Sequence, residues 1–177
     1  MNIFIGCSSQ NAHNLRYKNE AEKLGNFINT NKHTLVFGGC NSGLMGVIYN
    51  SIANKTDYIV AVLSKAYEND LNSLSYKKSY VFDTIIERKQ CFYDHSDALV
   101  FLPGGIGTLD EIISAIESKR NHEHSLPILI VNTNGFFNPL LNMINKIYAE
   151  GFTNPKFSKL YHVVNSCDDV IKLLSKN

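Results

Sequence analysis

Short apolar runs recur along this chain, and the intervals between most of them leave room for a helix. Each run has three to six residues and is rich in branched side chains, and glycine, proline or asparagine lies next to most of them. Such runs are typical of strands buried on both faces, as in parallel sheets. The candidate strands cover residues 3–5, 35–37, 58–63, 98–102 and 128–131.

The segments between these runs show helical spacing. In residues 16–29, Tyr17, Ala21, Leu24 and Ile28 recur at the three- and four-residue intervals of one helix face. Similar patterns predict further helices, and the chain closes with a short strand and a helix that starts at Asp168. These further elements are the helices 44–53, 84–95, 109–118 and 136–150 and the strand 161–164.

Alternation of strand and helix requires right-handed crossovers and a sheet covered on both faces. The predicted fold is therefore a single-domain, Rossmann-like three-layer α/β fold, with a mostly parallel, doubly wound sheet and helices on both faces. The 177 residues contain no linker or repeat, so we expect residues 1–177 to form one domain. Residues 68–80 are polar and lack a clear period; a solvated connection is favoured there over a lid near the ligand.

Charge and cysteine content argue against several classes of function. Lys and Arg number 17 against 16 acidic residues, so the chain lacks the basic excess of proteins that bind a nucleic acid polymer. The four cysteines form no CxxC motif and predict no metal site. No apolar run approaches the about 20 residues of a membrane span, and no basic leader opens the chain. We therefore expect a cytoplasmic protein with free thiols and no membrane partner.

Three strand ends carry glycine-rich or small-residue loops, at residues 6–11, 38–46 and 103–108. In a doubly wound sheet such loops share the carboxyl edge, where helix N-termini favour an anion, so together they suggest a phosphate-bearing ligand. None matches a standard nucleotide motif, because the second lacks GK[ST] and the third has Asp110 where a dinucleotide fingerprint has glycine or alanine. Tight strand-to-helix turns are the alternative explanation for these glycines.

Two further residues admit both a structural and a functional interpretation. Thr108 and Glu111 match the S/T-x-x-E capping box, yet Glu111 would also lie at the mouth of the site, facing a developing positive charge on a sugar. Arg88 shares a helical stripe with Ile85 and Phe92, so its guanidinium needs an exit to solvent or an anionic partner, which is either a ligand or a structural carboxylate. Both alternatives stay open for each residue at this point.

The segments GGCNSGLMG, ERK and LPGGIGTLDE, in this order and spacing, resemble the LOG family of phosphoribohydrolases, whose members are often labelled lysine decarboxylases. The resemblance covers nearly the whole chain and implies that residues 1–177 form a nucleotide-binding catalytic domain. It implies hydrolysis of the N-glycosidic bond of a nucleoside 5'-monophosphate, a cytokinin riboside monophosphate or AMP, to free base and ribose 5-phosphate. It also implies that no cofactor is needed and that the protein is a homodimer or larger assembly with its site near the interface.

Carried onto this chain, the resemblance implies that Arg88 and Glu111 are the catalytic pair. The family's acidic substrate-binding residue would fall near Asp70. The remaining substrate-binding residues would be Lys89, Gly104, Gly105, Ile106, Gly107, Thr108, Ser8, Gly39, Gly43 and Met45. The chain departs from the family pattern at Cys7, Ile85, Ile86, Phe92 and Ser118, which affects the expected nucleobase preference more than the bond chemistry. The alternative function is a nucleotide or molybdenum-cofactor carrier on the same fold, with no turnover.

Overall fold

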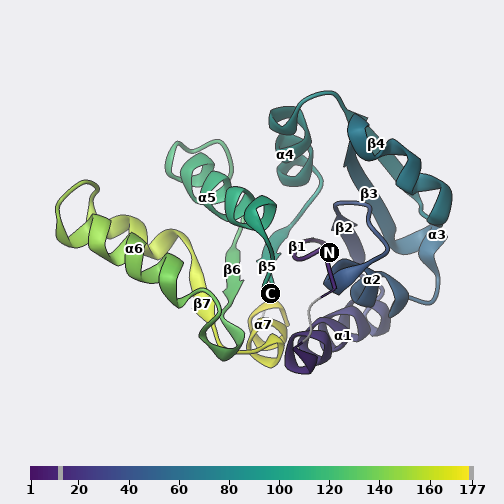
Figure 1. The fold of residues 1–177 in the computed structure, drawn as a ribbon, viewed down its shortest axis with the longest axis horizontal. Coiled ribbons are helices and arrows are strands. Elements are labelled where there is room, and N and C mark those ends of the chain that lie inside the picture. The colour runs from purple at the N-terminus through teal and green to yellow at the C-terminus, as the bar shows by residue number, and fades with distance from the viewer. Residues whose placement is uncertain (12–13, 176–177) are drawn as a thin grey trace.

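The computed structural model describes residues 1–11 and 14–175 and has one seven-stranded sheet (Figure 1). The strand order is β4-β3-β2-β1-β5-β6-β7, and every neighbouring pair is parallel. The predicted doubly wound α/β fold is thus confirmed, with a fully parallel sheet in place of a mostly parallel one. The strands are β1 (Asn2–Gly6), β2 (Thr34–Phe37), β3 (Ile59–Ser64), β4 (Lys78–Phe82), β5 (Ala98–Phe101), β6 (Ile128–Val131) and β7 (His162–Val164).

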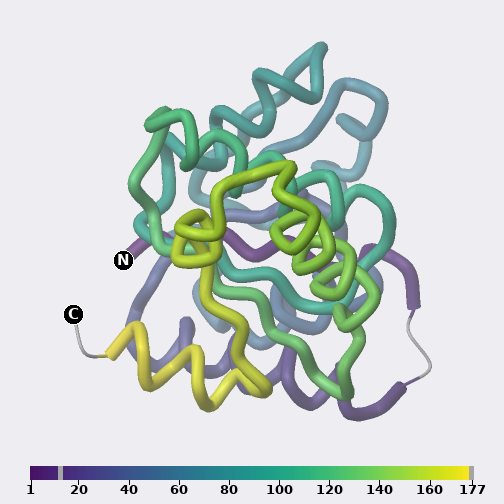
Figure 2. The backbone as a smooth tube through the Cα atoms, turned by 90° about the vertical axis from the view of Figure 1, so that its left-hand side faces the viewer, coloured from purple at the N-terminus to yellow at the C-terminus, as the bar shows by residue number. Residues whose placement is uncertain are grey.

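Helices cover both faces of the sheet, as Figures 1 and 2 show from two directions. One layer holds α1 (Leu15–Thr30), α2 (Gly43–Asn50) and α7 (Cys167–Leu174). The other holds α4 (Ile85–Asp94), α5 (Ile106–Arg120) and α6 (Asn138–Ala149). The short elements are α3 (Lys55–Tyr58) and three 3₁₀ segments, η1 (Lys65–Ser73), η2 (Thr133–Gly135) and η3 (Pro155–Leu160). No described helix is both long and apolar enough to cross a bilayer.

Each central strand contributes side chains to two separate cores, because successive residues of a strand point to opposite faces. On β1, Ile3 and Ile5 pack with α1 and α2, whereas Phe4 packs with α4 and α5. All three side chains are almost completely buried. Burial on both faces explains why these strands appear in the sequence as continuous apolar runs.

The expectation for residues 68–80 is corrected by the structure. The segment contains most of η1 and the start of β4, in place of an irregular connection. β4 lies at the sheet edge and is only half-buried, so its sequence, KSYVF, lacks the apolar run that marks the central strands. An edge strand pairs on one side only, and its burial signal in the sequence is correspondingly weak.

The strand order reverses between β1 and β5, which lie side by side at the centre of the sheet. Connections from β1 run to one side of this point and those from β5 to the other, so a crevice opens outside their carboxyl ends. The loops after β1, β2, β3 and β5 therefore meet at one edge of the sheet, and that edge carries the candidate site.

Candidate active site

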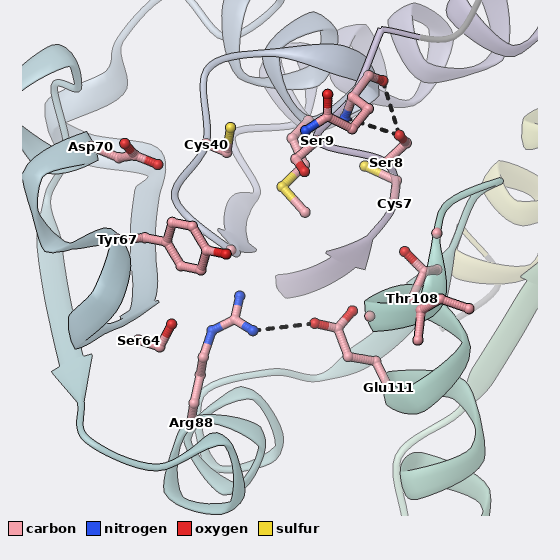
Figure 3. Close-up of a pocket in the computed structure, with 16 residues that line it drawn as sticks. Cys7, Ser8, Ser9, Cys40, Ser64, Tyr67, Asp70, Arg88, Thr108 and Glu111 are labelled. Carbon is pink, nitrogen blue, oxygen red and sulfur yellow. Dashed lines mark hydrogen bonds and ion pairs between the residues drawn. The ribbon is translucent and has the colours of Figure 1, made fainter.

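A cavity of about 590 Å³ lies at this edge, within the size range of small-molecule sites. It is lined by residues from the loops after β1, β2, β3 and β5, together with side chains of α4 and α5 (Figure 3). Segments more than a hundred residues apart in the sequence thus contribute to one cavity. Among the described residues, no group of three or more His, Cys, Asp or Glu side chains is arranged to hold a metal ion.

Arg88 reaches the cavity from α4 and is held in place along its length. Its Nε donates a hydrogen bond to the Val62 carbonyl oxygen at 3.1 Å, and its guanidinium lies 4.9 Å from the centroid of the Phe92 ring. Burial lowers the pKa of Arg88 from its ordinary value, and Glu111 opposes that shift. The expected stripe is correct for Phe92 but wrong for Ile85, which is 57% exposed.

Glu111 projects from α5 toward Arg88 and is 8% exposed (Figure 3). Its Oε1 lies 3.6 Å from the Arg88 Nη1, so the two side chains form a partly shielded ion pair. Burial raises the pKa of Glu111 to about 7, although Arg88 favours the ionised form. Gly6 permits this position, because a Cβ on Gly6 would lie 2.8 Å from Glu111 Oε2. The carboxylate is therefore poised to hold or release a proton near neutral pH.

The capping-box interpretation of Thr108 and Glu111 is wrong. Helix α5 begins at Ile106 with Gly105 as its N-cap, and the Leu109 amide donates to the Gly105 carbonyl at 3.1 Å. Thr108 therefore lies inside the first turn, and Glu111 lies in the second turn. Gly104 lies so close to Thr108 that a Cβ on Gly104 would collide with the Thr108 Oγ1. Since Glu111 does not cap the helix, its burial needs another explanation.

The N-terminus of α5 faces the same cavity. Gly105, Ile106, Gly107 and Thr108 line it, whereas Gly104 packs behind them against Thr108. The first amides of a helix have no intrahelical acceptor and favour an anion. A Cβ on Gly105 or Gly107 would meet nothing within 4 Å, so a ligand can approach the backbone closely there. The arrangement is suited to a phosphate.

The other predicted substrate-binding residues divide into two groups. Ser8 and Met45 line the cavity, whereas Gly39 and Gly43 do not. Gly43 has a φ of +59°, and a Cβ there would lie 2.6 Å from the Ser8 carbonyl oxygen. Gly43 therefore allows the loop after β2 to pack on the loop after β1, a supporting function that the sequence pattern does not distinguish from ligand contact.

Lys89 does not line the cavity, unlike its neighbour Arg88. Its Nζ lies 3.1 Å from both carboxylate oxygens of Asp110 and 2.7 Å from the Ser114 Oγ. Lys89 thus joins α4 to α5. The expectation of direct substrate contact has no support in this geometry.

Sequence reasoning missed Ser64 and Tyr67, which line the cavity from the end of β3 and from η1. Ser64 is the last residue of the correctly predicted strand β3 and Tyr67 follows it, so their position at the carboxyl edge of the sheet was the available signal. Asp70, expected near the substrate from the family resemblance, also lines the cavity. Cys7 and Cys40 line it as well, and burial strongly raises the pKa of the Cys7 thiol.

Known proteins resemble this chain along most of its length. The cytokinin riboside 5'-monophosphate phosphoribohydrolase LOG1 of Arabidopsis thaliana is 30% identical over 173 residues, which is 97% of this chain and 81% of that protein. The corresponding LOG3 protein of the same plant is 27% identical over 98% of this chain and 81% of its own length.

A solved structure of the molybdenum cofactor carrier protein of Chlamydomonas reinhardtii superposes with a TM-score of 0.69 at 18% identity, covering 99% of this chain and 96% of that one. At that identity the likeness shows a common fold and no more. A family model described as "Possible lysine decarboxylase" matches residues 43–174, most of the chain. With the LOG proteins as relatives over nearly its full length, the chain belongs to the LOG family.

Proposed function

We propose that this protein hydrolyses the N-glycosidic bond of nucleoside 5'-monophosphates, cytokinin riboside monophosphate or AMP, to free base and ribose 5-phosphate. The observation that carries the proposal is the buried Arg88–Glu111 pair, which lies in the same cavity as the N-terminus of α5. That cavity offers an anion-binding end and a carboxylate at its centre. Both are required to hold a phosphorylated sugar and to cleave its glycosidic bond.

The 5'-phosphate would bind at the residues from Gly105 to Thr108, where the helix amides and the Thr108 hydroxyl can donate hydrogen bonds. This end of the substrate does not react. Binding energy gained there can be used to position the ribose against Glu111, which lowers the barrier to reaction.

At the ribose, cleavage passes through a state in which positive charge develops on C1' and the ring oxygen. The Glu111 carboxylate would stabilise that charge and accept a proton from the attacking water. The water oxygen bonds to C1' as the C1'–N bond breaks, and the bonding electron pair leaves with the nucleobase, which takes up a proton from solvent. Glu111 then returns the proton it accepted from the water to solvent, so the free base and the ionised carboxylate are both restored. Arg88 would favour the ionised form of Glu111 and orient it, and Lys89 would support the pair by joining α4 to α5.

The direct experiment incubates the purified protein with AMP and with isopentenyladenosine monophosphate and measures released ribose 5-phosphate. We expect release from at least one of the two nucleotides. If neither nucleotide yields ribose 5-phosphate while both bind measurably, hydrolysis is rejected in favour of a carrier function on this fold.

We further propose that the protein works as a cytoplasmic homodimer with the cavity near the subunit interface. Four isoleucines are exposed on α4 and α5, the helices that carry Arg88 and Glu111, with exposed fractions from 45% to 82%: Ile85, Ile86, Ile106 and Ile113. Exposed apolar side chains on two adjacent helices are suited to an interface between copies. The net charge of +1 supports neither a nucleic acid polymer nor an anionic membrane as partner.

A further inference from the structure

The candidate cavity has two chemically different ends (Figure 3). Thr108 and the loop residue Ser8 lie at one end, and Glu111 and Arg88 lie in the middle. Beyond Arg88 the wall is formed by η1 and the end of β3. A nucleotide whose phosphate binds α5 and whose glycosidic bond lies at Glu111 would therefore extend its base past Arg88, toward η1.

Tyr67 is the one aromatic residue among the described residues that line the cavity. Its ring projects from η1 toward the centre of the cavity, on the opposite side of Arg88 from Glu111 (Figure 3). The residue is 64% exposed, and no described aromatic ring or cation is stacked on it. A large ring exposed in a concave site offers contact area at little cost in conformational entropy, because it has only two rotatable side-chain bonds.

We propose that Tyr67 stacks on the nucleobase of the bound nucleotide and determines a preference for purines over pyrimidines. The inference rests on the proposed function, since it takes the substrate to be a nucleoside monophosphate bound with its phosphate at α5. A bicyclic purine presents a larger π-face than a pyrimidine, so the stacked ring favours it. Ser64 and Asp70 lie on the same wall and supply polar groups for the edge of the base.

The kinetic test compares Tyr67→Ala and Tyr67→Phe with the wild-type protein. Tyr67→Ala should raise the KM for AMP roughly ten-fold or more, as expected for a lost base–aromatic stack, and should reduce the preference for AMP over CMP. Inhibition by ribose 5-phosphate, which has no base, should stay unchanged. Tyr67→Phe keeps the ring and should behave as wild type. A Tyr67→Phe variant as impaired as Tyr67→Ala would overturn stacking, because the hydroxyl would then be the essential group.

A binding test does not depend on turnover. The chain contains no tryptophan, so Tyr67→Trp places a single fluorescent indole in the cavity. AMP should quench its fluorescence, whereas ribose 5-phosphate should not. Phe152→Trp, at an exposed residue outside the cavity, is the matched control and should not respond to either ligand.

The two tests separate failure of this inference from failure of the proposed function. Hydrolysis of AMP that is unaffected by Tyr67→Ala would overturn the stacking role and leave the hydrolase intact. Quenching by AMP without release of ribose 5-phosphate would support stacking and reject hydrolysis. Absence of quenching, or equal quenching by AMP and ribose 5-phosphate, would overturn the assignment of Tyr67.

Discussion

At the scale of single residues, the environment of Glu111 determines what the cavity can do. The carboxylate is removed from water, which favours its neutral form, while the guanidinium of Arg88 at 3.6 Å favours the charged form. The balance brings the pKa to about 7, so the group can exchange a proton near neutral pH. Such opposed influences on one buried carboxylate are characteristic of catalytic sites.

Replacing Glu111 by Gln should lower the rate of ribose 5-phosphate release by at least roughly a hundred-fold, because the amide can neither accept a proton nor carry negative charge. The fold should persist, as judged by circular dichroism, since Gln has nearly the same volume. Glu117→Gln is the matched control on the same helix, where the carboxylate is half-exposed and paired with Arg120. Near-normal release by the Glu111→Gln variant would refute the assigned role.

The raised pKa also predicts how activity and stability depend on pH. The catalytic rate should increase as pH rises through about 7, where Glu111 loses its proton, and then level off. In the unfolded chain the same carboxyl titrates near 4.5, so between pH 4.5 and 7 the folded state binds more protons. The contribution of Glu111 to stability therefore decreases as pH rises through this window.

The measurement is the free energy of unfolding of wild type relative to Glu111→Gln, which lacks the titrating group. Relative to that of Glu111→Gln, the free energy of unfolding of wild type should decrease by up to about 3 kcal/mol between pH 4.5 and pH 8. A pH-independent difference would show that Glu111 titrates normally in the folded protein.

At the scale of elements, the start of α5 decides which groups reach the cavity. Because the helix starts at Ile106, the exposed backbone of Gly107 belongs to its first turn, and Glu111 moves back into the second turn, where it is buried. The glycines at the turn have separate roles. Gly104 allows close packing on Thr108, whereas Gly105 and Gly107 leave open space.

Gly107→Ala should therefore change stability and activity in opposite directions. Alanine favours the helix by up to about 1 kcal/mol over glycine, and the new methyl group meets no protein atom. The same methyl group would restrict the approach of a phosphate to the helix amides, so the KM for AMP should rise. Thermal unfolding and steady-state kinetics measure the two effects. Adenosine, which has no 5'-phosphate, serves as the comparison ligand, and its binding should be little affected.

At the scale of the whole molecule, the reversal of strand order brings distant segments together. Gly6, Arg88 and Glu111 come from three separate parts of the chain. Glu111 forms an ion pair with Arg88, and Gly6, which has no side chain, leaves room for the Glu111 carboxylate. The same arrangement leaves apolar side chains exposed on α4 and α5, the helices that carry Arg88 and Glu111. A homodimer formed through these helices would cover the isoleucines and enclose the cavity.

Ile86→Glu tests this assembly, because a charge buried in an apolar interface costs several kcal/mol. Wild type should sediment with twice the 19.9 kDa mass of one chain, and the variant should move toward the monomer. Met143→Glu, at an exposed position on α6, is the control and should remain dimeric. A monomeric wild type at micromolar concentration would contradict the proposed dimer.

Much of this architecture could be predicted from local pattern. Residues 3–5, 35–37 and 98–102 are continuous apolar runs because β1, β2 and β5 are buried on both faces, and their alternation with helical segments restricts the topology. The edge strand β4 was missed for the complementary reason, since a half-buried strand carries a weak apolar signal. The glycine-rich loops were placed correctly at the carboxyl edge.

The sequence by itself determined the α/β fold, the edge of the sheet that carries the cavity and the membership in a family, because these depend on hydrophobic period and on motifs of neighbouring residues. Only the tertiary structure decided where individual side chains lie and what they contact. Arg88 and Lys89 are adjacent in the sequence, yet one faces the cavity and the other binds Asp110. Side-chain direction, burial and the exact start of a helix depend on contacts between distant segments. The spacing of residues in the sequence does not reveal those contacts.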